Sequence, residues 1–258
     1  MNNEIQFIGI IPARYASTRF PGKPLAMLGG KPVIQHVYEQ ARKALDTVVV
    51  ATDNQRILDC VRSFGGEAVM TREDHPCGTN RCFEAYLKLR GKVQPNDVII
   101  NVQGDEPFIQ PEQIELLKSC FPTDIATLVK PYTEEDGTTA LFNPNSPKVV
   151  VAEGKALYFS RSVIPYLRGI KEEEWLSESV RRDTPYYKHI GMYAYSARVL
   201  EQIVALPQSP LEKAESLEQL RWLEAGYTIR VAKTDTQTIG IDTPEDLRAA
   251  EAYMARFL

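Results

Sequence analysis

The stretch that decides the fold reads Ile8-Gly9-Ile10-Ile11-Pro12-Ala13-Arg14-Tyr15-Ala16-Ser17-Thr18-Arg19-Phe20-Pro21-Gly22-Lys23-Pro24. A short apolar run, residues 5–11, is rich in isoleucine and bounded by Pro12, which predicts a buried strand. Pro12, Pro21 and Pro24 exclude a helix after it, so we expect an ordered loop. In open α/β sheets, ligands bind at loops of this kind, beyond the carboxyl end of a strand.

This loop concentrates positive charge. It contains Arg14, Arg19 and Lys23 together with the hydroxyls of Ser17 and Thr18. A guanidinium offers a planar fork to phosphate oxygens, and an ammonium offers a compact charge. A solvated basic loop is the alternative, but the formal net charge of the chain is -4, so the cluster does not follow from composition. The pattern favours a loop that binds a polyphosphate.

The composition is typical of a globular protein and excludes several classes. The chain has 258 residues, of which 43% are hydrophobic and 25% charged. Its acidic balance argues against a nucleic-acid-binding surface. No apolar run reaches membrane-spanning length, and the start of the chain lacks the positive charge of a signal peptide, so we expect a cytoplasmic protein. The four cysteines lack zinc-site spacing, so we expect reduced thiols: Cys60, Cys77, Cys82 and Cys120.

Helix and strand signals alternate through the first half, which predicts a mostly parallel sheet flanked by helices, a Rossmann-like α/β fold. From Ala126 the pattern changes to hairpins, with strands expected at 148–151, 156–160 and 188–195. We therefore expect one domain over residues 1–258, with a strand-rich insertion at about 126–200. After it, Ser209 and Glu212 predict a capping box, followed by a helix whose buried stripe contains Leu217, Leu220 and Leu223.

A polar loop, residues 72–81, runs into a helix that is expected to end near Gly91. Thr79 or Asn80 could cap this helix, and its N-terminal amides could then meet an anion or the edge of a base. An ordinary capped helix start fits the same spacing, and the residues alone leave the two possibilities open.

Two aspartates are candidate ligands of a magnesium ion. Asp105 follows the clearest central strand, 97–103, where a carboxylate would face the ligand edge of the sheet. A turn carboxylate with local hydrogen bonds is the alternative. Near the C-terminus, Thr243 and Asp246 predict a capping box for the last helix, which leaves the neighbouring Asp242 without a structural role.

These motifs resemble a known family. The run from Pro12 to Leu25 resembles the signature loop of the sugar-acid cytidylyltransferases, and among them of the enzymes that act on 3-deoxy-manno-octulosonate (Kdo). The run Val102-Gln103-Gly104-Asp105-Glu106-Pro107 is similar to the second signature of that family, and Pro210 to Arg221 to a third. Matching motifs extend from residue 8 to residue 246 in the family order.

The resemblance implies a nucleotidyltransferase fold, CTP and Kdo as substrates, Mg²⁺ as cofactor and a homodimer. The product would be CMP-Kdo for lipopolysaccharide biosynthesis. Its implied nucleotide contacts are Arg14, Arg19, Lys23, Gln103, Gly78, Thr79 and Arg81. Its implied metal ligands are Asp105 and Asp242, with Arg14 and Lys23 completing the catalytic set. Residues expected to bind the sugar acid are Lys148, Arg161, His189, Glu218 and Gln219. Where the family has a serine before Gly78, this chain has Cys77.

Other functions remain as alternatives. A CMP-sialate synthetase or another sugar nucleotidyltransferase would share the same fold and chemistry. A regulatory nucleotide-binding protein would not need Asp105 and Asp242, which are both present. An NAD-dependent dehydrogenase is disfavoured because no Gly-x-Gly-x-x-Gly follows the first strand.

Overall fold

The computed structural model describes residues 4–236 and 239–257, so residues 1–3, used above for the expectation about targeting, lie outside it. The chain forms two compact units. Unit 1 comprises Met1–Lys118, Met192–Val204 and Gln237–Leu258, and unit 2 comprises Ser119–Gly191 and Ala205–Thr236. None of the described helices is both long enough and apolar enough to cross a membrane.

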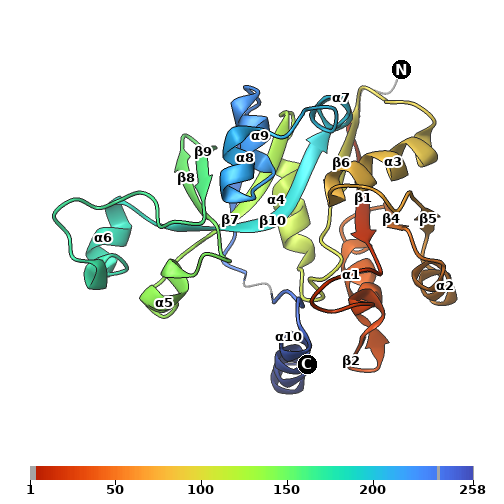
Figure 1. Ribbon diagram of the computed structural model, residues 1–258, viewed down its shortest axis with the longest axis horizontal. Helices are drawn as coiled ribbons and strands as arrows, with labels where there is room; N and C mark the ends of the chain where they lie inside the picture. Colours follow the sequence, from red (N-terminus) through yellow and green to blue (C-terminus); the bar gives the residue numbers. More distant parts are fainter. Residues whose placement is uncertain (1–3, 237–238, 258) are drawn as a thin grey trace. The chain divides into compact units, whose positions relative to one another are not determined.

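Unit 1 is built on a parallel sheet with the strand order β5-β4-β1-β6 (Figure 1). The end of β10 adds an antiparallel partner, with Tyr193 opposite Asn101 of β6. The strands are β1 (Gln6–Ala13), β4 (Thr47–Thr52), β5 (Ala68–Met70), β6 (Asp97–Asn101) and β10 (Tyr187–Ser196). A separate two-stranded ladder joins β2 (Met27–Leu28) to β3 (Lys31–Pro32).

Helices connect these strands as the alternating pattern predicts. The helices of unit 1 are α1 (Val33–Ala41), α2 (Gln55–Ser63), α3 (Gly78–Arg90), α4 (Pro111–Ser119), which runs into unit 2, α7 (Ala197–Ile203) and α10 (Pro244–Phe257), with a 3₁₀ turn at Lys23–Leu25. Gly65 follows α2 with a φ of 82°, the left-handed conformation that commonly ends a helix. The prediction of a mostly parallel sheet flanked by helices is confirmed.

The first strand is longer than expected, because Pro12 lies inside it. The Ile10 carbonyl accepts a hydrogen bond from Val102 N, so Ile10 faces β6, and Pro12, two residues on, faces the same side. The pairing with β6 has ended there, since its last registered pair is Ile10 with Asn101. The missing N–H of Pro12 therefore costs no ladder hydrogen bond, and the strand continues to Ala13.

Unit 2 contains the hairpin-rich part of the chain. Within it β7 pairs with β11 in parallel, whereas the pairs β11–β9, β9–β8 and β8–β10 are antiparallel. Its strands are β7 (Ile125–Pro131), β8 (Lys148–Ala152), β9 (Lys155–Ser160), β11 (Ile229–Lys233) and the first part of β10. Its helices are α5 (Gly137–Phe142), α6 (Glu178–Asp183), α8 (Pro210–Glu215) and α9 (Gln219–Glu224), with a 3₁₀ turn at Glu172–Glu174. This part of the chain is thus rich in strands. The prediction of one domain with an insertion at about 126–200 stays a prediction.

The helix of the third family motif also differs from its prediction. The helix expected after Ser209 is interrupted, because Ser216 adopts a φ of 51° at the end of α8. A residue in the left-handed region cannot continue a right-handed helix, so α9 begins anew at Gln219. The capping box that starts α8 is present as predicted, with Ser209 Oγ accepting from Glu212 N.

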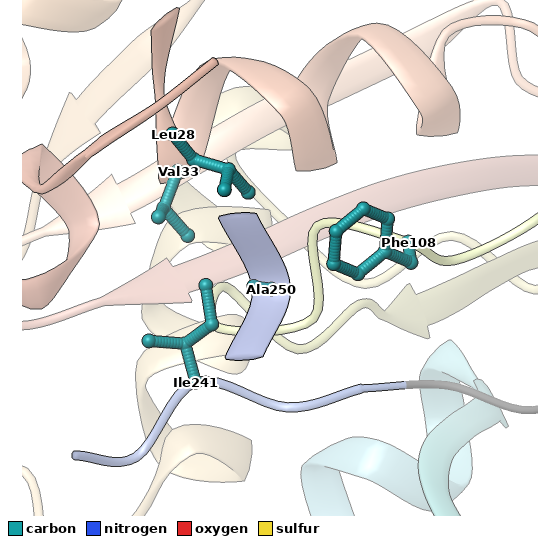
Figure 2. Packing of buried hydrophobic residues seen from close by; sticks show 5 residues of the cluster. All are labelled: Leu28, Val33, Phe108, Ile241 and Ala250. Atoms are coloured by element: carbon teal, nitrogen blue, oxygen red, sulfur yellow. The ribbon is translucent and has the colours of Figure 1, made fainter. Parts of the chain in front are cut away.

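A hydrophobic cluster ties the C-terminal segment to the rest of unit 1. Figure 2 shows Leu28, Val33, Phe108, Ile241 and Ala250 packed together, all at most 7% exposed. Phe108 lies in the loop after β6, and Ile241 immediately precedes Asp242. Because both are buried in one cluster, the backbones that carry Asp105 and Asp242 are held by the same core.

Candidate active site

Unit 1 contains a cavity of about 370 Å³ at the carboxyl ends of β1 and β6. Three loops and the segment before α10 contribute its walls. Its lining residues include Arg14, Ser17, Thr18, Arg19, Lys23, His75, Cys77, Gly78, Arg81, Gln103, Gly104, Asp105 and Asp242. Of the predicted nucleotide and metal residues only Thr79, which is buried in the first turn of α3, does not line this cavity.

Local hydrogen bonds fix the shape of the β1 loop. Gly22 N donates to Tyr15 O at 2.9 Å, and Leu25 N donates to Gly22 O at 2.8 Å. Gly22 has a φ of 71° and lies against the Tyr15 ring, so a side chain here would meet both strain and a contact. The loop is therefore ordered, as its prolines predict, and it directs Lys23 into the cavity from the first residue of a 3₁₀ turn.

The loop after β6 carries Asp105 close to the backbone of β1. A Cβ atom on Gly104 would lie 2.8 Å from Pro12 O, closer than real Cβ contacts, so only glycine fits here without movement. Beyond it, Asp105 O accepts a hydrogen bond from Ile241 N at 2.8 Å. This bond joins the Asp105 loop directly to the segment that carries Asp242.

The predicted capping box at α10 is confirmed, and it also positions Asp242. The Asp246 carboxylate accepts hydrogen bonds from Thr243 N, Thr243 Oγ1 and Asp242 N at 2.8 to 3.0 Å. Burial would raise the pKa of Asp246, but these hydrogen bonds outweigh burial and lower it. Asp246 stays ionised, and it holds the backbone of Asp242 while the Asp242 side chain faces the cavity.

Lys23 joins the two aspartates. Its ammonium lies 2.5 Å from Asp105 Oδ2 and 3.0 Å from Asp242 Oδ1. Arg19 contacts the other Asp242 oxygen at 3.0 Å. Burial would lower the pKa of Lys23, but the charges and hydrogen bonds of both carboxylates outweigh burial and raise it. The structure thus brings two cations of one loop to two carboxylates that lie more than 80 residues further along the chain.

Arg14 differs from the other two cations of its loop. It lines the cavity, yet among residues 4–236 and 239–257 its guanidinium has neither a hydrogen bond nor an ion pair with a side chain. Its five donors are therefore available to an anion in the cavity.

The start of α3 corrects one prediction. The helix begins at Gly78, so its N-cap is Cys77, and neither Thr79 nor Asn80 caps it. The Cys77 side chain makes no capping hydrogen bond and instead contacts Asn80 Oδ1 at 2.8 Å. The helix thus starts earlier than expected, at Gly78. Gly78 packs beside the Pro12 ring, and a Cβ atom added to it would lie 3.4 Å from Pro12 Cγ.

Arg81 is almost fully buried in the wall of the cavity and is already paired. It donates to Asp53 Oδ2 at 2.7 Å and to Thr71 Oγ1 at 2.6 Å, and it is 4% exposed. Asp53 in turn accepts from Tyr15 N in the β1 loop. Arg81 thus links the ends of β4 and β5 to that loop, while its predicted contact with a nucleotide stays a prediction.

Sequence reasoning gave His75 no contact of its own within the polar loop and missed Glu84. His75 Nε2 contacts Glu84 Oε2, and Arg72 N donates to the same oxygen. Burial raises the pKa of Glu84, but hydrogen bonds from Lys88, Arg72 N and His75 outweigh burial and lower the pKa to about 2. Glu84 lies in the middle of α3, where a charged residue is normally solvated, so its sequence position carried no signal of this contact.

The protein residues around Lys23 provide only part of the ligand set that a magnesium ion needs. Asp105 and Asp242 both direct a carboxylate oxygen at one cationic centre. Among the described residues no group of three or more His, Cys, Asp or Glu side chains could hold a metal. Two carboxylates completed by water and phosphate oxygens are a common arrangement for Mg²⁺, so the two aspartates fit the ion when such oxygens complete its ligands.

The residues predicted to bind a sugar acid lie in unit 2, and the sheet brings three of them together. Lys148 pairs with Ser160 in β9, the residue before Arg161, and with Lys188 in β10, the residue before His189. Lys148 is fully buried, and burial lowers its pKa. Its ammonium donates to Asn143 O at 3.0 Å.

Arg161 is engaged in backbone contacts. Its guanidinium donates to the carbonyl oxygens of Glu215 at 2.6 Å, Pro144 at 2.9 Å and Ser216 at 3.3 Å. Arg161 therefore satisfies two carbonyl groups at the end of α8 and that of Pro144. Its predicted bidentate contact with a sugar carboxylate stays a prediction, and it would require donors to be shared.

His189 is held as a neutral imidazole. Its Nε2 lies 3.1 Å from Thr127 Oγ1, and the Phe159 ring packs edge-on against it at 5.2 Å. Removal from water lowers the pKa of His189 to about 3. It can therefore offer a sugar a hydrogen bond but no positive charge at neutral pH.

Glu218 and Gln219 lie at the junction of α8 and α9. Glu218 accepts from Arg221 at 2.6 Å, while Gln219 is 5% exposed and its side-chain nitrogen has no hydrogen-bond partner among the described residues. A buried amide with unused donors is costly unless something supplies an acceptor. The predicted contact of Gln219 with sugar hydroxyls would supply such an acceptor and remove that cost.

Comparisons with known proteins agree over most of the chain. The family profile described as cytidylyltransferase matches residues 8–231. A 3-deoxy-manno-octulosonate cytidylyltransferase of Parabacteroides distasonis is 59% identical over 97% of this chain and 99% of its own length. The corresponding protein of Phocaeicola vulgatus is 60% identical over 97% and 98%. A solved structure of CMP:2-keto-3-deoxy-manno-octonic acid synthetase with CTP is 42% identical, with a TM-score of 0.86 over 98% of this chain and 100% of that one. The predicted nucleotidyltransferase fold is confirmed.

Proposed function

This chain belongs to the cytidylyltransferase family and is a nucleotidyltransferase, and from that premise we propose that it converts CTP and Kdo into CMP-Kdo and diphosphate. The observation that carries the proposal is the meeting of Lys23, Asp105 and Asp242 at one cavity, beside Arg14, which has no side-chain partner in the part of the chain that the structure describes. This combination suits a triphosphate. The names of relatives at 59% and 60% identity support the choice of CTP and Kdo.

The proposed reaction is an in-line displacement. The anomeric hydroxyl of the sugar acid loses its proton to solvent water as its oxygen forms a bond to the α-phosphorus, the bond from that phosphorus to the bridging oxygen breaks, and diphosphate leaves with the electron pair. Arg14, Arg19 and Lys23 stabilise the negative charge that develops on the departing diphosphate. Asp105 and Asp242 would hold Mg²⁺, which would act as a Lewis acid on phosphate oxygens.

The sugar-acid residues of unit 2 supply different interactions. Because His189 is neutral, a carboxylate would receive its positive charge from Lys148 or Arg161. Glu218 and Gln219 offer an acceptor and unused amide donors for hydroxyl groups. We further propose that the enzyme acts as a cytoplasmic homodimer and that CMP-Kdo is used for lipopolysaccharide assembly, both of which rest on family membership.

A substrate panel tests this function. Diphosphate release by the purified protein with Mg²⁺ is measured for CTP, UTP and ATP, each with Kdo or with sialic acid. Release with CTP and Kdo alone is expected. Release with CTP and sialic acid would contradict the choice of sugar and favour a CMP-sialate synthetase. No release from any pair, in protein that binds CTP, would favour the regulatory alternative.

A further inference from the structure

The carboxylates suited to a divalent cation are already bonded to cationic side chains. Lys23 contacts Asp105 Oδ2 and Asp242 Oδ1, and Arg19 contacts Asp242 Oδ2. The Lys23 side chain is only 16% exposed, whereas Arg19 is 64% exposed. Charge-assisted hydrogen bonds are strong when partly buried, so the Lys23 contacts are the ones that must be replaced.

An ammonium and a metal ion cannot use these oxygens at the same time. Mg²⁺ requires oxygen ligands at about 2.0–2.1 Å in a compact octahedron. Lys23 Nζ is within hydrogen-bond distance of an oxygen from each carboxylate, and its charge would repel a dication placed between them. Binding of the metal therefore requires that Lys23 leave at least one aspartate.

We propose that Lys23 is a built-in competitor of the divalent cation at Asp105 and Asp242, released when the phosphates of the nucleotide provide its ammonium with another anionic partner. The inference rests on the proposed function for the identity of the nucleotide. Arg14, which has no ion pair with any of the described residues, receives a phosphate group without first breaking one, and Lys23 follows. The metal then binds together with the nucleotide and only weakly before it.

The test measures binding of Mn²⁺ alone, without nucleotide or sugar, by the electron paramagnetic resonance signal of the free ion. Lys23→Met removes the competing charge and keeps the length of the side chain. We expect its Mn²⁺ dissociation constant to be at least about tenfold lower than that of the wild type. Arg14→Met is the matched control, because it removes a charge from the same cavity without touching either aspartate. Its constant should change by about twofold or less.

A second variant separates competition from loss of structure. Lys23→Gln keeps a hydrogen-bond donor but no charge, and it should also bind Mn²⁺ more tightly than the wild type. Adding Asp105→Asn to Lys23→Met should abolish this gain if the ion binds at the carboxylates. Circular dichroism checks that each variant is folded.

Three outcomes would overturn the inference: equal constants for the wild type and both Lys23 variants, an equal gain in Arg14→Met, or no binding of Mn²⁺ by any folded variant. Because no substrate is present, these outcomes are independent of the substrate panel. Unchanged Mn²⁺ binding in an enzyme that makes CMP-Kdo would reject the inference and keep the function. If the wild type is inactive and its Lys23 variants bind Mn²⁺ more tightly, the inference is kept and the proposed function is rejected.

Discussion

At the scale of single residues, the cations of the cavity differ in whether they are already paired with a carboxylate. Lys23 is bonded to two carboxylates, whereas Arg14, nine positions earlier, has no side-chain partner among the described residues. Both were predicted from sequence as phosphate-binding cations. Their different states could not be predicted, because the partners of Lys23 come from segments 82 and 219 residues away.

The neutral state of His189 predicts a pH dependence. Its pKa is about 3 in the folded chain and about 6.5 when unfolded, so the unfolded state binds the extra proton between these values. This contribution to stability is present above pH 6.5 and is lost as the pH falls toward 3. Relative to His189→Gln, the free energy of unfolding of the wild type should fall by about 1–2 kcal/mol from pH 7 to pH 5. Urea denaturation at both pH values measures it, and a pH-independent difference would contradict the neutral state of His189.

At the scale of elements, short loops beyond the strands position the site. Gly104 and Gly78 both approach Pro12 from different elements, one from the loop after β6 and one from the first turn of α3. The space beside them differs, so an added methyl group should have opposite effects at the two positions.

We predict that Gly104→Ala destabilises the protein by about 1–3 kcal/mol, because its Cβ would lie 2.8 Å from the Pro12 carbonyl oxygen. It should also displace Asp105 and lower turnover. In Gly78→Ala the nearest atom is 3.4 Å away and alanine favours a helix, so stability should stay equal or rise by up to about 1 kcal/mol. Urea unfolding curves compare the two variants. Equal losses would show that the close approach to Pro12 is not the cause.

The cap of α10 gives a second prediction at this scale. Thr243→Ala removes the hydrogen bond from Asp246 N to Thr243 Oγ1 and should cost about 1 kcal/mol of stability. Because Asp246 also holds the Asp242 backbone, kcat should fall about tenfold or more. Ser196→Ala is the control, since Ser196 caps α7 in the same unit and does not contact either aspartate. We expect both variants to lose similar amounts of stability and only Ser196→Ala to keep a normal kcat. An equal loss of kcat in both would refute the role of the Thr243 cap in positioning Asp242.

At the scale of the whole molecule, the sequence predicted most strands and many, though not all, of the residues that line the cavity. Local patterns were sufficient for β1, the hairpin of β8 and β9, and the caps at Ser209 and Thr243. They were insufficient where long-range contacts decide. Pro12 stays in a strand because β6 has ended, and the break at Ser216 accompanies carbonyl contacts from Arg161. His75 and Glu84 meet through folding of a loop onto its own helix.

The central claim is that Asp105 and Asp242 form the catalytic centre of a cytidylyltransferase. It is tested most directly by the rate of diphosphate release from CTP and Kdo with Mg²⁺, compared among the wild type, Asp105→Asn, Asp242→Asn and the exposed surface control Asp59→Asn. Both site variants, folded by circular dichroism, should lose about 10²–10³-fold or more in kcat, while Asp59→Asn stays at the wild-type rate. A folded Asp105→Asn or Asp242→Asn enzyme with near-normal turnover would contradict the account.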